Sequence, residues 1–200
     1  MSNRSIHTLL KNWDEECPLT REEAVEVLNL PEEEMDSLME CAYALRTKYK
    51  GKKVSVQLLT NVRSGNCTQN CAYCAQSKDS QAEIEKYKRV SDEKLYGDND
   101  LVDEKHLARH CIGLSGIGFS DEEIEDLADR IREMKKKDTQ ICCSIGFLTE
   151  KQARILKDAG LDRINHNLNS SRSFYPEICT THTYDQRVNN IKMLQSLGFE

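Results

Sequence analysis

The sequence has no excess of basic residues and no long apolar run. Its 28 lysines and arginines face 34 aspartates and glutamates, a formal net charge of −6, so the electrostatic footprint of a nucleic-acid-binding domain is missing. No apolar stretch reaches the ~20 residues that a membrane-spanning helix needs. The start of the chain shows no secretory signal. We therefore expect a cytoplasmic, reducing location, where thiols stay free or bind metal.

Cysteine, by contrast, is plentiful, and nine cysteines in 200 residues indicate metal binding in such a compartment. Three of them, Cys67, Cys71 and Cys74, have the spacing C-x3-C-x2-C, with Tyr73 just before the third. Three thiolates on one short loop can hold three irons of a cubane cluster. The fourth iron then stays open to a small molecule, which suits a cluster that binds and reduces something.

Two other interpretations of these cysteines are a zinc site and a redox pair. Zinc prefers four closed ligands, usually supplied as two separated pairs, and no C-x2-C partner follows this loop. A disulfide framework is typical of small secreted domains, and this chain is too long and too charged for one. The spacing therefore favours an iron–sulfur cluster.

Residues 1–51 have the periodicity of helices. A capping-box pattern at Thr20 precedes a short apolar run, and Pro31 suits the first position of a helix. Apolar residues then recur at helical spacing up to Gly51, where the helix should end. We predict an N-terminal helical segment over residues 1–51.

From residue 52 onwards, strand and helix patterns alternate. The predicted strands span residues 54–60, 109–115, 140–145 and 163–169. Capping-box patterns led by Ser120, Thr149 and Thr183 begin three of the helices, and a weaker helix over 92–106 is interrupted by Gly97 and a run of Asp and Asn. Strands that alternate with helices indicate parallel βα units, which wind into a barrel through right-handed crossovers.

We therefore predict an α/β fold, a parallel (β/α) barrel of the TIM type, over residues 52–200. A closed barrel of this kind takes about eight βα units, and only the first four or so are present here. We expect the barrel to be truncated at the C-terminus.

Alternation along the predicted strands separates an apolar face from a polar one. The apolar face suits packing under the outer helices, and it includes Cys143. The polar face would point into the barrel, and it includes Cys111, Cys142 and three asparagines, Asn165, Asn167 and Asn169. Thiols and carboxamides are costly to bury without partners, so this pattern indicates a binding cavity.

Simpler interpretations exist for each of these residues. Cys111 and Cys142 taken alone are more often plain core cysteines. The asparagines are typical of turns and loops, although three on one face of a strand make that less fitting. His166 is favoured as a packed or hydrogen-bonded core histidine. Cys17, Cys41 and Cys179 have no partner in the pattern, and we assign them no function.

The cysteine loop resembles the cluster loop of radical S-adenosylmethionine (SAM) enzymes, and more narrowly that of biotin synthases. Four later stretches match the same family in order and with similar intervals. They are Cys111-Ile112-Gly113, then Ile141 to Gly146, then Ile164-Asn165-His166-Asn167-Leu168-Asn169-Ser170-Ser171, and last Phe174-Tyr175 with Thr180 to Tyr184 and Arg187. The resemblance covers about residues 53–200.

The resemblance implies a sulfurtransferase of the radical SAM class. Cys67, Cys71 and Cys74 would hold a [4Fe–4S] cluster whose open iron binds SAM. One electron from the cluster would cleave SAM to methionine and a 5′-deoxyadenosyl radical, which abstracts hydrogen from dethiobiotin. Cys111 and Cys142 would help to hold a second iron–sulfur cluster, [2Fe–2S] in the family, that donates the sulfur.

The same resemblance implies roles for five polar residues. Asn165 and Asn167 would lie near the substrate and Asn169 near the SAM ribose. Arg187 would pair with the SAM carboxylate, as a guanidinium fork suits, and Tyr73 would pack near the adenine. The family also implies a reducing electron donor such as flavodoxin or ferredoxin, a homodimer when the chain is full length, and no nucleic acid or membrane partner.

The sequence departs from the family pattern in two respects. Many members carry an aspartate where this chain has Asn169, and an amide bonds a ribose hydroxyl less strongly than a carboxylate does. A third cysteine for the second cluster is expected just beyond residue 200, and a further ligand, often arginine, much later. Two alternatives therefore stay open: a mutase- or maturase-like radical SAM enzyme without sulfur transfer, and a non-enzymatic iron–sulfur or zinc protein.

Overall fold

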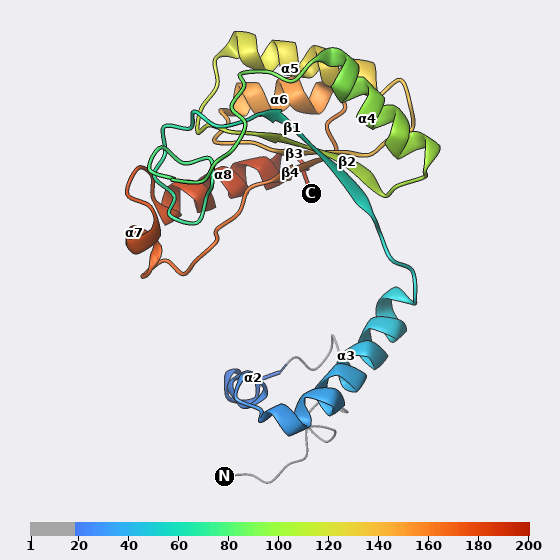
Figure 1. Ribbon diagram of the computed structural model, residues 1–200, viewed down its shortest axis with the longest axis vertical. Helices are drawn as coiled ribbons and strands as arrows, with labels where there is room; N and C mark the ends of the chain where they lie inside the picture. The colour runs from blue at the N-terminus through green and yellow to red at the C-terminus, as the bar shows by residue number, and fades with distance from the viewer. Residues whose placement is uncertain (1–18) are drawn as a thin grey trace. The chain divides into compact units, whose positions relative to one another are not determined.

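The computed structural model describes residues 19–200 of the chain (Figure 1). The chain divides into two compact units, Met1–Val54 and Ser55–Glu200. The part of the predicted helical segment over residues 1–18, with Cys17, lies outside the described residues. Within residues 19–200, no helix has the length and apolar character needed to cross a membrane.

The first unit is helical over its described part. It contains α2 (Arg21–Leu28), a 3-10 turn, η1 (Glu32–Glu34), and α3 (Met35–Lys50). The predicted capping box at Thr20 forms. The prediction that Pro31 begins a helix is wrong, because Pro31 is extended and caps the 3-10 turn, and α3 starts only at Met35. Such tighter turns are common at helix N-termini.

The second unit alternates strands and helices along a four-stranded parallel sheet of order β1-β2-β3-β4. The strands are β1 (Gln57–Arg63), β2 (Arg109–Leu114), β3 (Ile141–Ser144) and β4 (Arg163–Asn165). The helices are α4 (Asp92–Glu104), α5 (Asp121–Met134), α6 (Glu150–Asp158), α7 (Tyr175–Ile178) and α8 (Tyr184–Ser196). The capping boxes predicted at Ser120, Thr149 and Thr183 all form.

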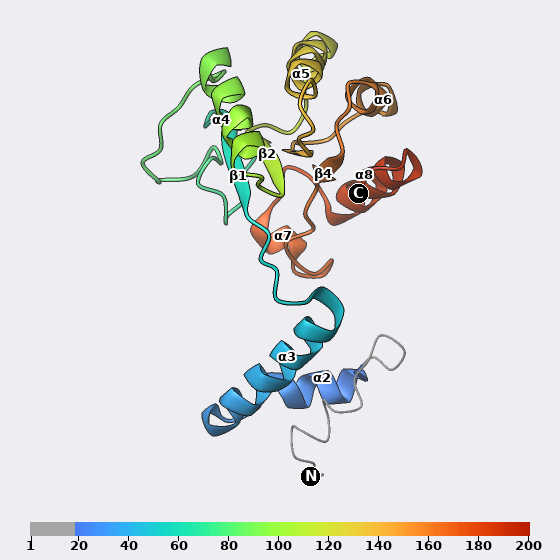
Figure 2. The same ribbon diagram turned by 90° about the vertical axis from the view of Figure 1, so that its right-hand side faces the viewer.

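Figure 2 shows α4, α5, α6 and α8 in an arc around the outer side of the sheet, with the strands inside. Each strand is hydrogen-bonded to the next one in sequence, and all pairs are parallel. This is the arrangement of consecutive βα units in a TIM-type barrel. The predicted fold class, a partial α/β barrel, is confirmed.

All four strands differ from the predicted bounds: by one residue at the end of β2 and at each end of β3, and by more in β4 and in β1, which also continues to Arg63. The first strand starts at Gln57 and not at residue 54. Gln57 lies opposite Arg109, which is the first residue of the partner strand β2, so β1 has no strand residue to pair with before Gln57. The fourth strand ends at Asn165, where its pairing with Ser144 ends. The chain beyond Asn165 leaves the sheet, and Asn169 takes a left-handed conformation with φ 65°.

The apolar core lies between the sheet and its outer helices. Ile112, Ile141 and Cys143 are fully buried in it, as the strand alternation predicts, together with the apolar side of α5. Burying each large aliphatic side chain contributes about 1.5–3 kcal/mol. Cys111 and Cys142 are also buried, but they are not part of this core cluster. The core therefore fixes the sheet and leaves its other face available for polar side chains.

Helix α4 forms in spite of its poor helix-forming sequence because two of its polar residues are buried with partners. Asp98 accepts a hydrogen bond from the Thr60 hydroxyl at 2.6 Å. Asp98 also forms an ion pair with Lys94 at 2.6 Å. Asn99 donates to the carbonyl of Met134 at 3.1 Å. Each satisfied contact removes a desolvation cost that an unpaired buried group would carry.

Candidate active site

The cysteine loop begins where β1 ends, at the edge of the sheet where the strands have their carboxyl ends. Gly65 and Asn66 both have positive φ, 68° and 53°, which turns the chain sharply out of the strand. Gly65 donates its N–H to Gln76 at 2.8 Å, and its carbonyl accepts from Ser115, just after β2, at 2.6 Å. In TIM-type barrels this edge carries the active site.

A second segment, far away in sequence, holds the loop in place. The N–H of Ala72 donates to the carbonyl of Ile178 at 2.9 Å. Asn70 donates its side-chain amide to Thr180 at 2.7 Å and accepts from the N–H of Thr180 at 3.0 Å and the hydroxyl of Thr181 at 3.1 Å. Because residues 178–181 are the last residue of α7 and the three that follow it, this short helix positions the cysteines.

The loop borders a cavity of about 210 Å³ that also touches the ends of β2, β3 and β4 and the first turn of α8. The cavity gathers every site residue predicted from the sequence except Cys111 and Cys142. These residues are Cys67, Cys71, Cys74, Tyr73, Asn165, Asn167, Asn169 and Arg187. Three thiols and several hydrogen-bonding groups therefore face one space that can hold a small molecule.

Arg187, in the first turn of α8, is held by neutral groups. Its guanidinium donates to the Tyr175 hydroxyl at 2.6 Å, to Nε2 of His182 at 2.9 and 3.1 Å, and to the carbonyl of Asn167 at 3.1 Å. Among residues 19–200 no carboxylate forms an ion pair with Arg187. Its positive charge is thus fixed in place at the cavity and open to an anionic ligand.

Asn169 and Tyr73 meet across the site. The amide of Asn169 donates to the Tyr73 hydroxyl at 2.6 Å, which joins the segment after β4 to the cysteine loop. Burial, together with the neighbouring Cys71 thiol, raises the pKa of Tyr73. The phenol therefore stays protonated at neutral pH and can also donate a hydrogen bond.

Cys71 is the most buried of the three loop cysteines. Burial raises the pKa of Cys71 to about 11, and the nearby thiol of Cys179 contributes to the shift. The two sulfurs are 3.8 Å apart. His182 lies beside them, with Nδ1 3.3 Å from the Cys179 sulfur and 3.0 Å from Oε1 of Gln69. These three sulfur and nitrogen ligand atoms lie within 4.8 Å of one another.

The sequence interpretation missed Cys179 and the contact of His182 with it. Cys179 has no spacing relation to the cysteine loop, since the two are joined by tertiary contacts, such as those of Asn70 and Ala72. The one available signal was its position directly before the Thr180 to Tyr184 stretch that resembles the family. His166, which was favoured as a packed core histidine, does pack on Phe147 with ring centroids 5.1 Å apart.

Cys111 and Cys142 lie outside this cavity but directly beside each other. They are register partners on β2 and β3. Burial raises the pKa of Cys142 to about 11, helped by the adjacent Cys111 and opposed by Arg163 and Arg109. The Cys111 thiol donates to Gln57 at 2.9 Å. Two thiols next to each other, with guanidinium groups nearby, form a second candidate metal-binding position.

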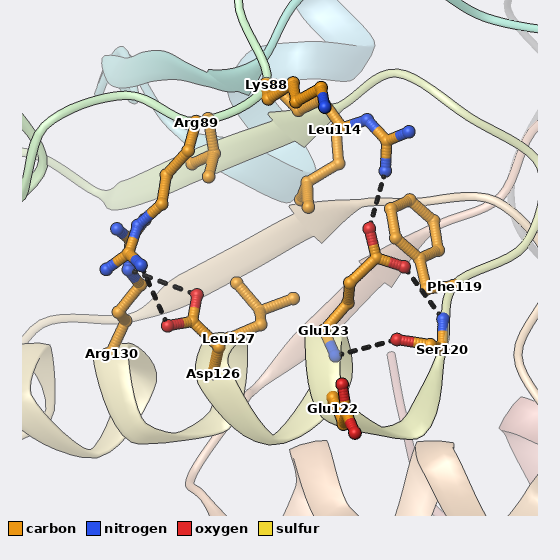
Figure 3. Close-up of a pocket in the computed structure, with 12 residues that line it drawn as sticks. Lys88, Arg89, Leu114, Phe119, Ser120, Glu122, Glu123, Asp126, Leu127 and Arg130 are labelled. Atoms are coloured by element: carbon orange, nitrogen blue, oxygen red, sulfur yellow. Dashed lines mark hydrogen bonds and ion pairs between the residues drawn. The ribbon is translucent and has the colours of Figure 1, made fainter.

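A separate cavity of about 330 Å³ lies on α5, between the helix and residues 88–89 (Figure 3). Four of its charged side chains form two ion pairs: Arg63 with Glu123 at 3.0 Å, and Arg89 with Asp126 at 3.1 Å. None of the site residues predicted from the sequence lines it. The cavity beside the cysteine loop, which gathers the loop thiols and Arg187, is therefore the candidate active site.

Curated proteins similar to this chain include several biotin synthases. The chain is 39% identical to the biotin synthase of Geobacillus kaustophilus over 181 residues, which cover 90% of this chain and 54% of that protein. It is 40% identical to the biotin synthase of Bacillus subtilis (strain 168), with the same coverage. The chain thus spans about half the length of the curated relatives it matches.

Two solved structures share the fold at low sequence identity. Methylornithine synthase (PylB) matches with a TM-score of 0.81 at 16% identity, over 96% of this chain and 55% of that one. HydG, a maturase of the [FeFe]-hydrogenase, matches with a TM-score of 0.71 at 18% identity, over 90% of this chain and 41% of that one. At these identities the likeness shows the fold alone.

The profile of the radical SAM superfamily matches residues 61–200, which include the cysteine loop and every strand end that borders the cavity. With this match and the similarity to the N-terminal portion of biotin synthases, the chain belongs to the radical SAM superfamily.

Proposed function

We propose that the protein is a radical SAM sulfurtransferase that converts dethiobiotin to biotin. The observation that carries the proposal is the single cavity in which three loop cysteines meet Arg187 and the asparagines after β4. About 40% identity to biotin synthases over 90% of the chain supports the choice of substrate. A cytoplasmic location and a homodimeric state belong to the same proposal.

The residues of the cavity fit a [4Fe–4S] cluster with SAM. Cys67, Cys71 and Cys74 supply the three thiolates, which leaves one iron for a small-molecule ligand. When bound, the cluster supplies the electron that cleaves SAM and so generates the radical. Iron binds the thiolate form, so Cys71, whose pKa burial raises to about 11, would release a proton on binding the cluster.

The side chains around the thiols orient SAM. Arg187 has no carboxylate partner among the described residues, and the N–H groups of its fork would donate to the SAM carboxylate. Asn169 bonds the ribose hydroxyls. Tyr73 lies against the adenine, and its hydroxyl is held by Asn169 at 2.6 Å.

Asn165 and Asn167 bind the substrate from the same side of the cavity. Carboxamides both donate and accept hydrogen bonds, which suits the ureido group of dethiobiotin. By holding the substrate beside the SAM-binding residues they would orient its reactive carbon.

Cys111 and Cys142 supply two thiolates of the sulfur-donating cluster. Their register pairing sets them side by side, and Arg109 and Arg163 lower the cost of the charge on the Cys142 thiolate. A [2Fe–2S] cluster of the usual kind takes four protein ligands, so this pair is half of such a set. The electron that the reaction needs comes from a reduced donor protein of the flavodoxin or ferredoxin class.

The first experiment is electron paramagnetic resonance of the protein reconstituted anaerobically with iron and sulfide, then reduced, with and without SAM. We expect a [4Fe–4S]⁺ signal that changes shape when SAM is added. A signal indifferent to SAM, or bound zinc in place of iron, would contradict the radical SAM assignment.

The substrate is tested by incubating the same protein with SAM, a reductant and dethiobiotin. We expect 5′-deoxyadenosine and biotin to form together. If SAM is cleaved without consumption of dethiobiotin, the radical chemistry stands but the sulfur insertion does not.

A further inference from the structure

We propose that Cys71 and Cys179 close a reversible disulfide when the protein lacks its cluster, which makes Cys179 a modification site that guards a cluster ligand. The proposal rests on the assignment of Cys71 to the cluster made above. The two sulfurs are 3.8 Å apart. Their residues are 8% and 3% exposed, so they are buried together.

Backbone hydrogen bonds hold the two thiols as neighbours. The N–H of Ala72, next to Cys71, donates to the carbonyl of Ile178, next to Cys179, at 2.9 Å. The N–H of Cys179 donates to the backbone carbonyl of Tyr175 at 3.0 Å. Bonded sulfurs lie about 2.05 Å apart, so the thiols must approach by only about 1.8 Å, a distance that side-chain rotation covers.

A single metal ion bound by Cys71, Cys179 and His182 fits less well. Two thiolates on one tetrahedral zinc ion, each about 2.3 Å from it, would also lie near 3.8 Å apart. The guanidinium of Arg187, however, donates to Nε2 of His182, so the neutral ring carries its proton on Nδ1 and donates it to Gln69. Coordination through Nδ1 would move that proton to Nε2, against the N–H groups of Arg187.

The two thiols border different cavities. Cys71 lines the site cavity. Cys179 lines a second cavity of about 340 Å³, formed by α7 and the start of α8 together with Arg172. Cys179 therefore borders a space other than the one that the cluster and SAM require, although its 3% exposure means that a disulfide reagent reaches its sulfur only when this segment opens locally.

The oxidant is a low-molecular-weight disulfide, RSSR. The Cys179 thiolate attacks one sulfur of RSSR, which forms a mixed disulfide and releases one RS⁻. Cys71 then attacks the Cys179 sulfur, which forms the internal disulfide and releases the second RS⁻. RSSR takes up two electrons and becomes two thiols, and the two cysteines lose two protons and two electrons.

The disulfide and the cluster exclude each other because a Cys71 sulfur in a disulfide is not a thiolate ligand. A disulfide is restored by thiols, whereas a cysteine oxidised to a sulfinic acid is not. The pair thus keeps Cys71 available for later cluster assembly.

The test treats the protein, freed of iron under nitrogen, with oxidised glutathione and then maps its tryptic peptides by mass spectrometry. We expect the peptide of residues 64–78 to be joined to that of residues 173–187 through Cys71 and Cys179 as the main cysteine product, and dithiothreitol to release it. The Cys179→Ser variant should lose this product. The matched control Cys74→Ser, altered in the same loop, should keep it.

A second readout follows the oxidation state of Cys71 itself. After treatment with oxidised glutathione, then hydrogen peroxide, then dithiothreitol, the tryptic map of the wild-type protein should show Cys71 as a free thiol. In Cys179→Ser a larger share of Cys71 should carry sulfinic acid, because no disulfide protects it.

Three results would overturn the proposal: no joined peptide in the wild-type protein, a joined peptide formed through Cys67 or Cys74 instead of Cys71, or tight zinc binding that depends on Cys179 and blocks oxidation. The tryptic map of the wild-type protein tests the disulfide even where a variant fails to fold. Because the map needs neither SAM nor activity, its failure is distinct from a failure of the proposed enzymatic function.

Discussion

Two groups of cysteines are positioned in this protein by different means. Cys67, Cys71 and Cys74 lie on one loop and share one cavity. Cys111 and Cys142 come from different strands and are brought together only by the register of β2 and β3. The first group is set by local sequence spacing, and the second by the pairing of strands. A change in a loop residue should therefore disturb the first group alone.

The largest expected effect is the loss of the SAM-responsive cluster in a Cys67→Ser variant. A hydroxyl is a poor substitute for a thiolate ligand of iron. In reconstituted protein the [4Fe–4S]⁺ resonance that responds to SAM should disappear.

The control for this variant is Cys111→Ser, which should retain the SAM-responsive signal and lose only iron bound at the strand pair. Iron analysis and electron paramagnetic resonance measure both. Loss of the SAM-responsive signal in both variants would show that the two groups are not independent.

An Arg187→Lys variant should weaken SAM binding by about 10- to 100-fold. The lysine keeps the charge but loses the fork that bonds a carboxylate, and a hydrogen bond to a charged group contributes about 1.5–3 kcal/mol. Titration of the cluster signal with SAM measures the affinity.

The matched control is Arg172→Lys, because Arg172 pairs with Asp185 at the surface and lies outside the site cavity. An equal loss of affinity in both variants would remove Arg187 from the SAM site.

A Gly146→Ala variant tests how the loops after β2 and β3 fit together at the site. A Cβ at Gly146 would lie 2.4 Å from the carbonyl oxygen of Ile117, which is backbone and cannot rotate away. We expect a loss of about 1–3 kcal/mol in unfolding free energy, measured by urea denaturation.

The control for that variant is Gly118→Ala, where a Cβ would meet nothing within 4 Å. Equal unfolding free energies of the two variants would show that the loops after β2 and β3 can move apart without loss of stability. The loops at the site would then be less rigid than the paired strands β2 and β3.

The smallest expected effect concerns pH. Burial, assisted by Arg187, lowers the pKa of His166 to about 4 from its ordinary value of 6.5. As the pH falls below about 6.5, the unfolded chain binds a proton there and the native protein does not, so stability decreases until about pH 4. A His166→Phe variant, which keeps an aromatic ring against Phe147, should lose less stability than wild type between about pH 7 and pH 5.

Urea denaturation at both pH values measures the difference. His110 and His182 are present in both proteins, so only the part of their titration that depends on His166 differs between the two curves. Parallel pH curves for wild type and variant would contradict the prediction.

Much of the fold could be predicted from the sequence because its signals are local. The capping boxes at Ser120, Thr149 and Thr183 satisfy backbone groups within one helical turn, so the helix starts were predicted to the residue. The strand ends were not, because they depend on what the partner strand offers. The first strand starts at Gln57, opposite Arg109. The alternation of apolar residues at Val54 and Val56 predicts an earlier start, because it carries no information on where β2 begins.

The sequence by itself determined the fold class and the cysteine loop, since periodicity and spacing are properties of neighbouring residues. Only the tertiary structure decided that Arg187 and Asn169 share a cavity with that loop. It also decided that Cys179, which has no pattern of its own, lies 3.8 Å from Cys71. The physical reason is that these contacts join segments more than 90 residues apart, through hydrogen bonds and packing that no local pattern encodes.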